Sequence, residues 1–174
     1  LYNSISEILK NNNIEYVKWD MNRSISDWYS GLLPSNRQGE QPHRYVLGLY
    51  ELLERLTTEF PHILFEGCSG GGGRFDAGML YYCPQIWCSD DTDAHERTFI
   101  QYGTSFFYPI STVGSHVSAV PNHQTGRITS LDTRGIVAMA GSFGYELDLS
   151  TLTEEEKETM KEQVKKYREY QLLI

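Results

Sequence analysis

The spacing of apolar residues along the chain alternates between a helical period and short continuous runs. The helical period recurs in five segments: 1–11, 42–59, 93–107, 130–139 and a last helix that begins after Thr153. The apolar runs predict strands at 14–20, 62–68, 85–89, 113–120 and 142–147. Such alternation implies parallel strands with right-handed crossovers. Two architectures fit, an open doubly wound sheet or part of a (β/α)8 barrel.

The helical segments also predict which side chains face the core. We expect the core positions to be Leu1, Ile5, Ile8 and Leu9 in the first helix, Tyr45, Leu49, Leu52, Leu53 and Leu56 in the second, Ala94, Phe99 and Tyr102 in the third, and Met160, Val164 and Tyr167 in the last. The sequence from Thr153 to Glu156 is a capping box, which predicts where the last helix begins. Residues 21–40, rich in Gly, Pro, Ser and Asn, are expected to form a long loop.

In both architectures the functional groups lie at the carboxyl ends of the strands. The polar residues predicted there are Asp20, Cys68, Asp90, His116 and Glu146. Lys18 and Asp20 have the same parity, so on a strand both side chains leave by one face. A cation so close favours an ionised Asp20, as a nucleophile or general base requires.

Asp90 follows a strand as Asp20 does, so two carboxylates are expected in one cleft. That is the arrangement of glycoside hydrolysis, in which one carboxylate attacks the anomeric carbon and the other acts as acid and base. Asp91 and Asp93 are nearby charges that favour a protonated acid. The competing interpretation is a helix N-terminus capped by acidic residues. We expect both to hold, with Asp93 as the cap and Asp90 as the functional group.

Other candidate sites are weaker. The run from Ser69 to Gly73 lacks the Lys of a phosphate-binding loop and the spacing of a dinucleotide fingerprint, so it indicates either backbone held close to a ligand or a flexible turn. Cys68 is a candidate nucleophile without an identifiable His partner. Cys83, Cys88 and His95 match no zinc spacing. Trp19 and Trp87, next to the carboxylates, are either sugar platforms or packing residues.

Composition narrows the class of protein. The 174 residues are 40% hydrophobic and 13% aromatic, which is typical of one globular domain. A net charge of −8 argues against nucleic acid or an anionic membrane as partner. Three cysteines do not form a disulfide framework and favour a reducing compartment, hence a cytoplasmic location. The chain starts without Met and stops on apolar residues, so we expect it to be part of a longer chain.

Several segments together resemble glycoside hydrolase family 36, the bacterial-type α-galactosidases. They are Lys18-Trp19-Asp20-Met21-Asn22-Arg23, Cys68 to Asp76, Ser89 to Ala94, Gln101 to Ser105, His116 to Gln124 and Gly144 to Asp148. The resemblance covers nearly the whole chain in order, and the set is specific although no single motif is decisive.

The resemblance implies a retaining barrel hydrolase of terminal α-galactosides such as melibiose and raffinose. Asp20 is similar to the family's nucleophile and Asp90 to its acid/base. Lys18, Asn22, Cys68 and Gly71 are similar to residues that line the galactose subsite. The resemblance further implies no metal, no organic cofactor and, in many members, a homotetramer.

The resemblance also implies the domain organisation. Residues 1–174 would be a partial catalytic barrel, about strands 4 to 8, without the family's N-terminal β-sandwich, early strands and C-terminal β-domain. Alone, such a piece exposes two sheet edges, so we expect it to fold poorly or be inactive. The alternatives are a galactosyl transferase of the same family, an inert fragment or sugar-binding module, and, on the glycine run alone, a nucleotide-binding domain.

Overall fold

The computed structural model describes residues 1–22 and 25–173. Its helices are α1 (Tyr2–Asn11), α2 (Gln41–Glu59), α3 (Ala77–Tyr82), α4 (Ala94–Ser105), α5 (Leu131–Ala138) and α6 (Glu154–Tyr170). Its strands are β1 (Tyr16–Asp20), β2 (Leu64–Cys68), β3 (Gln85–Trp87), β4 (Val113–Ser118) and β5 (Ser142–Glu146). Short 3-10 turns are η1 (Ser35–Glu40), η2 (Ile110–Thr112), η3 (Leu149–Thr151) and η4 (Gln171–Leu173).

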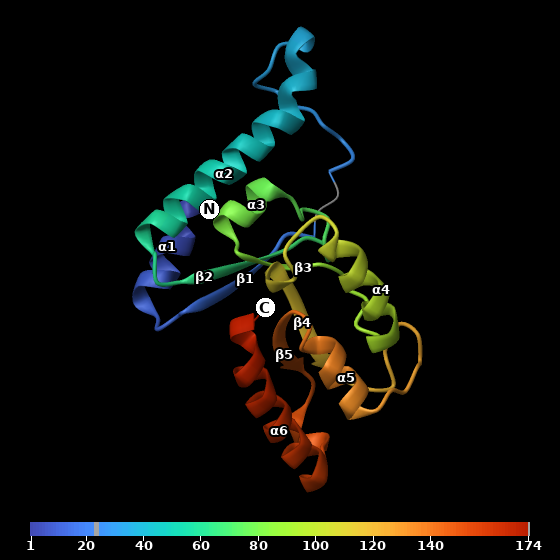
Figure 1. Ribbon diagram of the computed structural model, residues 1–174. Helices are drawn as coiled ribbons and strands as arrows, with labels where there is room; N and C mark the ends of the chain where they lie inside the picture. The colour runs from blue at the N-terminus through green and yellow to red at the C-terminus, as the bar shows by residue number, and fades with distance from the viewer. Residues whose placement is uncertain (23–24, 174) are drawn as a thin grey trace.

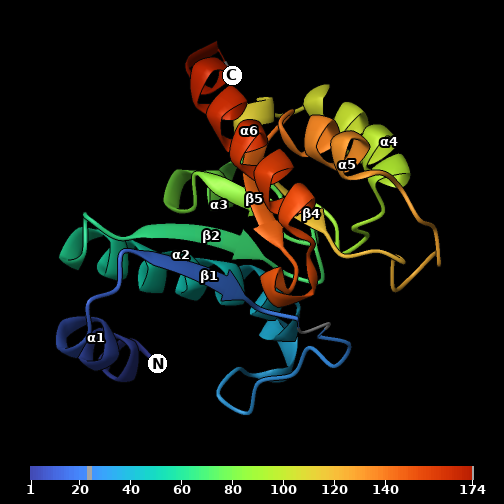
Figure 2. The same ribbon diagram turned by 90° about the horizontal axis from the view of Figure 1, so that it is seen from below.

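The five strands form one parallel sheet in the order β1-β2-β3-β4-β5, which is the order of the chain. A doubly wound sheet would instead reverse its strand order at a switch point. The sheet curls into a half-barrel flanked by the helices (Figures 1 and 2). The prediction of an α/β fold with part of a barrel is therefore confirmed, and the doubly wound alternative is wrong.

Strand register sorts the side chains onto two faces. Lys18 pairs with Glu66, and Asp20 pairs with Cys68, so these four share a face. Continuing the register across the sheet adds Gln85, Trp87, Gly114, His116, Ser118, Ser142, Gly144 and Glu146. This set, with Tyr16 and Leu64, is called the concave face below. It is mostly polar, whereas the opposite, convex face is mostly apolar.

The apolar core lies between the convex face and the first helices. Leu53 and Leu56 of α2 are fully buried, as predicted, and pack with Phe65 of β2 and Ile86 of β3. Trp19 points to this cluster, away from Asp20. Trp19 is therefore a packing residue, and the idea that it forms a sugar platform is wrong.

Two predicted helix faces are partly wrong. In α4, Phe99 and Tyr102 are 64% and 67% exposed, while the polar residues Arg97 and Gln101 are buried. The reason is that the convex side of β4 offers carbonyl and hydroxyl groups, which these polar side chains bind. In α1, Leu9 is buried, but Leu1 and Ile8 are exposed, and Ser6 takes a core position because its hydroxyl binds Glu59.

Helix ends agree better with prediction. Thr153 and Glu156 form the predicted capping box, and Met160 is buried below it, with Val164 and Tyr167 half-buried. Helix α3, which the apolar spacing did not predict, begins after Asp76, whose carboxylate accepts a hydrogen bond from Met79 N at 2.9 Å. Its six residues are too few to show a helical period.

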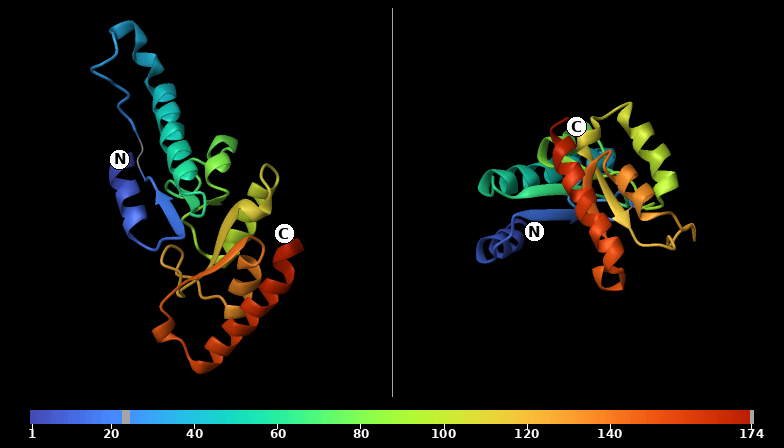
Figure 3. Two further views of the ribbon diagram at one scale, coloured as in Figure 1. Left: turned by 90° about the vertical axis from the view of Figure 1, so that its left-hand side faces the viewer. Right: turned by 60° about the horizontal axis from the view of Figure 1, so that its bottom comes forward.

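The long loop predicted after β1 is present but ends in the 3-10 turn η1. Residues 25–40 and the first turns of α2 project beyond the sheet (Figures 1 and 3). Trp28 packs edge-on against Tyr45 of α2, with ring centroids 5.8 Å apart. Arg23, the last residue of the first family-like segment, lies outside the described residues.

Candidate active site

The carboxyl edge of the concave face gathers the polar residues predicted at the strand ends. Asp20 ends β1 and Cys68 ends β2, side by side in register. Asp90 follows β3 by three residues, so it stands on a loop and not on the strand itself. Asp20 and Asp90 are both exposed, as groups that meet a substrate must be.

Asp20 is held by the turn that follows it. Asn22 Nδ2 donates to Asp20 Oδ2 at 3.0 Å. Asn22 Oδ1 in turn accepts from the backbone N–H of Gly70 at 2.6 Å, which ties the end of β1 to the glycine run after β2. The predicted neighbours Asp20 and Asn22 are thus brought together, and Asn22 orients the carboxylate.

Cys68 borders Asp20 but does not have the properties of a nucleophile. Burial, together with the Asp20 carboxylate beside it, raises the pKa of its thiol to about 11. A thiol with such a pKa is neutral near pH 7 and acts as a weak donor or packing group. The alternative of cysteine catalysis is therefore disfavoured, while its predicted contact with sugar stays a prediction.

Trp87 connects Lys18 to Asp90. Lys18 Nζ lies 4.5 Å from the centroid of the Trp87 ring, and Trp87 Nε1 donates to Asp90 Oδ1 at 3.1 Å. The side chains of β1 and the loop after β3 therefore open onto one space. Of Trp19 and Trp87, the two tryptophans considered as sugar platforms, Trp87 is the one that belongs to the site, although it is 3% exposed.

The glycine run brings the loop after β2 against the loop after β3. Gly71 has φ +74°, and a Cβ there would lie 2.7 Å from Ser89 Cα and 2.8 Å from Asp90 N. Only glycine allows this contact, because the backbone is left-handed and there is no room for a side chain. This close approach accounts for Gly71 without a ligand. Its predicted role in sugar binding remains a prediction.

The acidic cluster after Asp90 divides as expected. Asp93 caps α4, accepting from His95 N at 2.8 Å, and pairs with Arg127 Nη1 at 2.8 Å. The ion pair and the cap hold its pKa below the usual value even though burial opposes them. Because Arg127 compensates its charge, Asp93 does not serve as the source of negative potential for Asp90 that the sequence suggested.

His116 and Glu146 form a further pair on the concave face. The His116 ring stacks on Trp87 at 4.6 Å, and its Nδ1 lies 3.2 Å from Glu146 Oε2. Sequence reasoning placed both residues at strand ends but assigned neither a role. The sequence did contain a signal for this pair, namely the alternation of side chains along the strands. It places His116 and Glu146 on the same face as Trp87, the residue that precedes the loop of Asp90.

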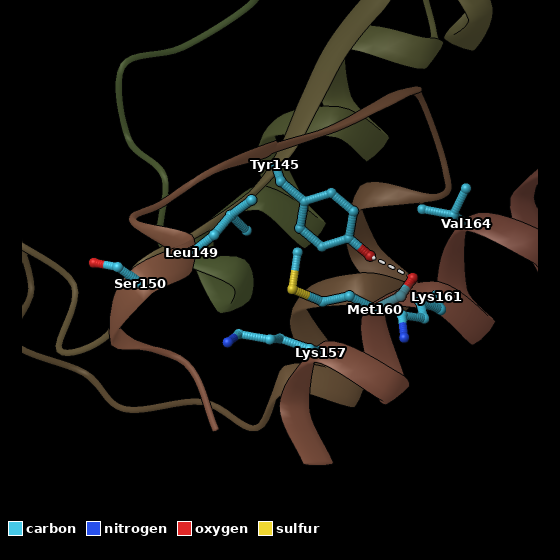
Figure 4. A pocket seen from close by; sticks show the side chains of 7 residues that line it. All are labelled: Tyr145, Leu149, Ser150, Lys157, Met160, Lys161 and Val164. Carbon is cyan, nitrogen blue, oxygen red and sulfur yellow. Dashed lines mark hydrogen bonds between the residues drawn. The ribbon is translucent and has the colours of Figure 1, made fainter. Parts of the chain in front are cut away.

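A separate groove lies on the convex side, where β5 meets α6. It has a volume of about 760 Å³ and is lined by Tyr145, Leu149, Ser150, Lys157, Met160, Lys161 and Val164 (Figure 4). Its lining contains no carboxylate, and Tyr145 faces away from the concave side. We therefore exclude this groove as the catalytic site despite its size.

Within residues 1–22 and 25–173, His, Cys, Asp and Glu side chains form no group of three that could hold a metal ion. All three cysteines are free, and no helix in these ranges has the length and apolar content needed to cross a membrane.

The curled parallel sheet and the carboxylates at its carboxyl edge define the class: part of an α/β-barrel catalytic domain. The model of the Melibiase family matches residues 1–174. The chain therefore belongs to this family, the α-galactosidases of glycoside hydrolase family 36.

Individual relatives agree with this family assignment. The chain is 61% identical over 174 residues to α-galactosidase 1 of Pediococcus pentosaceus, covering 100% of this chain and 24% of that enzyme. A variant of the GH36 α-galactosidase AgaA of Geobacillus stearothermophilus, crystallised with raffinose, matches with a TM-score of 0.95 and 60% identity over 97% of this chain and 24% of that one. An AgaA variant in complex with stachyose matches with a TM-score of 0.94. The chain thus spans about a quarter of these relatives.

Proposed function

We propose that these residues form the catalytic part of an enzyme that hydrolyses terminal α-D-galactosides with retention of configuration. The observation that carries the proposal is the pair Asp20 and Asp90, exposed at one edge of the concave face and connected through Lys18 and Trp87. Relatives named α-galactosidases, two of them in complex with raffinose and stachyose, indicate the substrate class.

In the proposed mechanism Asp20 attacks the anomeric carbon from the β face, and the bond to the leaving oxygen breaks. Asp90 gives its proton to that oxygen and then takes a proton from water. The water attacks the β-galactosyl ester, which restores the α configuration and frees Asp20. Asn22 holds the Asp20 oxygen in place, and Lys18 supplies positive charge on the same face.

The roles also draw support from how the AgaA complexes were obtained. The raffinose complex carries an Asp-to-Asn change and the stachyose complex an Asp-to-Ala change. In that chain the two substituted aspartates are as many positions apart as Asp20 and Asp90 are here. A glycosidase without one of its two carboxylates retains bound sugar, because the displacement then lacks its nucleophile or its acid.

The remaining expectations belong to the same proposal. Residues 1–174 would be about the fourth to eighth strands of the barrel, with the first strands, a β-sandwich and a C-terminal β-domain supplied by other residues. The site would use no metal or organic cofactor, the enzyme would be cytoplasmic, and the full-length protein would assemble as a homotetramer. Because β1 and β5 both present free edges, we expect residues 1–174 alone to be inactive.

The test uses the complete gene product, an aryl α-galactoside and three variants. Asp20→Ala should abolish turnover, and azide should restore it with formation of the β-galactosyl azide. Asp90→Ala with azide should give the α-galactosyl azide. Asp132→Ala, which removes an exposed carboxylate from the first turn of α5, should leave the rate unchanged. The opposite anomers would reverse the two roles, and an active, unrescued Asp20→Ala enzyme would refute the mechanism.

A galactosyl transferase remains the second candidate from the same fold. Product analysis at high acceptor concentration separates the two, since a transferase forms new galactosides where a hydrolase releases free galactose.

A further inference from the structure

The position of Asp90 on a loop raises the question of what fixes its carboxylate. β3 ends at Trp87 and α4 begins at Ala94, so six residues, 88–93, connect them. A general acid must stay within hydrogen-bond reach of the leaving oxygen, and a misplacement of about 1 Å costs roughly 10²-fold in rate. Residues that restrain this loop therefore influence catalysis without touching substrate.

Arg97 of α4 binds the loop on both sides of Asp90. Its Nη2 donates to the carbonyl oxygen of Ser89 at 2.8 Å, and its Nε donates to the carbonyl oxygen of Asp91 at 2.7 Å. One rigid guanidinium thus holds the peptide groups that flank the acid. The side chain is buried, with Arg97 4% exposed, so water does not compete for these bonds.

The same guanidinium is anchored to the strands. Arg97 Nη1 donates to Cys88 Sγ at 3.0 Å and to the carbonyl oxygen of Gly114 in β4 at 3.3 Å. Its Cζ lies 4.0 Å from the centroid of the Trp87 ring. The guanidinium therefore ties the loop to β3 through Trp87 and to β4 through Gly114.

Trp87 completes the connection, because the ring against which Arg97 packs donates its indole N–H to Asp90 Oδ1 at 3.1 Å. The loop's other side is closed by Gly71, whose Cα approaches Ser89 and Asp90 too closely to admit a Cβ. Backbone and carboxylate of Asp90 are thus restrained by separate contacts.

We propose that Arg97 and Trp87 are positioning residues for the general acid Asp90: Arg97 fixes the loop through the two carbonyls that flank Asp90, and Trp87 orients its carboxylate. The proposal rests on the function proposed above. Neither residue needs to contact the sugar, since both act through Asp90.

A purely structural role for Arg97 would be the alternative. Burial lowers its pKa, and its four hydrogen bonds described above go to neutral acceptors and none to a carboxylate. Charged groups buried without a direct counter-ion are costly. A residue that only packed α4 against the sheet could be apolar. The planar fork of donors is needed for the two flanking carbonyls, and Lys does not reproduce it.

The leaving group distinguishes positioning from mere stability. Raffinose loses an alcohol that needs the acid's proton, whereas 2,4-dinitrophenol departs as a stable anion without it. Because kcat/KM reports steps up to cleavage, loss of acid positioning should slow raffinose far more than the dinitrophenyl α-galactoside. Loss of folded enzyme should slow both equally.

The experiment compares Arg97→Lys and Trp87→Phe in the complete gene product. We expect kcat/KM for raffinose to fall about 10²-fold in Arg97→Lys and about tenfold in Trp87→Phe, with less than a threefold change for the dinitrophenyl substrate. The matched control is Arg134→Lys, because Arg134 is also buried and donates to a backbone carbonyl, that of Ser118 at 2.6 Å, in β4. Its effect should be equal for the two substrates.

The outcomes are separable. If Arg97→Lys does not fold, Trp87→Phe, which keeps an aromatic ring but removes the indole N–H, decides alone. An equal loss on both substrates in Trp87→Phe, or no loss on either, would overturn the proposal. A wild-type enzyme without activity on either galactoside would instead overturn the proposed function on which it rests.

Discussion

The two halves of the half-barrel are held together by different chemistry. Around β1 and β2 the convex face packs on α2 and α3 through an apolar cluster that includes Leu53, Leu56 and Phe65. Around β4 and β5 the buried residues that meet α4, α5 and α6 include Val113, Val117, Ala138 and Met160, but beside them stands a set of buried polar residues that the other half lacks in such number: Arg97, Gln101, Ser115, Ser118, Arg134 and Gln163. Asp20 stands over the apolar half, and Asp90 is bound to the polar one.

This difference has a physical consequence. Apolar packing is strong but non-directional, so it stabilises the sheet without fixing any one loop. Buried hydrogen bonds add little net stability but constrain orientation and are costly to break. The half that carries the loop of the proposed acid Asp90 is the half richer in directional contacts.

The largest loss of stability is expected on the apolar side. Leu56→Ala removes a fully buried side chain from the cluster and should lower the free energy of unfolding by about 2–5 kcal/mol. Leu47→Ala on the same helix removes a side chain that is 53% exposed and should change the free energy of unfolding by less than about 0.5 kcal/mol. Urea denaturation of the two variants measures the contrast. Similar midpoints would mean that the cluster does not stabilise this half.

On the polar side we expect a smaller loss of stability, and one in which the effects of two substitutions depend on each other. Gln101 accepts from Ser115 Oγ at 2.8 Å and donates to the carbonyl of Val137 at 3.0 Å. Gln101→Ala should cost about 1–3 kcal/mol, because the buried hydroxyl of Ser115 loses its acceptor and the carbonyl of Val137 loses one of its donors. Ser115→Ala should then cost less in the Gln101→Ala background than in wild type. Strict additivity in this double-mutant cycle would show that the hydrogen bond contributes nothing.

The smallest loss of stability is expected at the edge of the polar half. Tyr145 Oη donates to Gln163 Oε1 at 2.8 Å, beside the groove of Figure 4. Tyr145→Phe should cost about 0.5–1.5 kcal/mol at neutral pH. Burial raises the pKa of Tyr145 to about 12, so the phenol's contribution is complete below about pH 10 and lost as the pH rises through 12. Between about pH 10 and 12, Tyr145→Phe should therefore lose less stability than the wild type. Unfolding curves recorded at alkaline pH would measure the difference.

Sequence pattern was sufficient for the centre of the apolar half, formed by β2 and α2, but not for α1 or α3. The continuous apolar runs of β1 and β2 and the helical spacing of Leu49, Leu53 and Leu56 depend on burial alone, and burial follows from residue type. The same reasoning failed in α4, where Phe99 is exposed and Gln101 is buried. Polar side chains are buried only when distant segments supply partners, and no local pattern contains those partners.

In the candidate site, too, local sequence patterns indicated some features, whereas others depend on distant segments. Asp20 and Asp90 were predicted as site residues because each follows an apolar run, which is a local signal. The contacts that hold Asp90 were not predicted, because Arg97 reaches carbonyl groups of two other segments and its role is absent from its own helical spacing. Gly71 was assigned to the sugar, although its left-handed backbone and its approach to Ser89 already require glycine.

The order of strands in the sheet has a consequence for synthesis. Each strand after β1 pairs with the one made just before it, so its partner has already been translated when it emerges. A ribosome therefore delivers the βα units in the order in which they dock, each on an edge that is already present. By the time Asp90 emerges, the strand that carries Asp20 has a neighbour, and the platform for the second carboxylate exists before the carboxylate does.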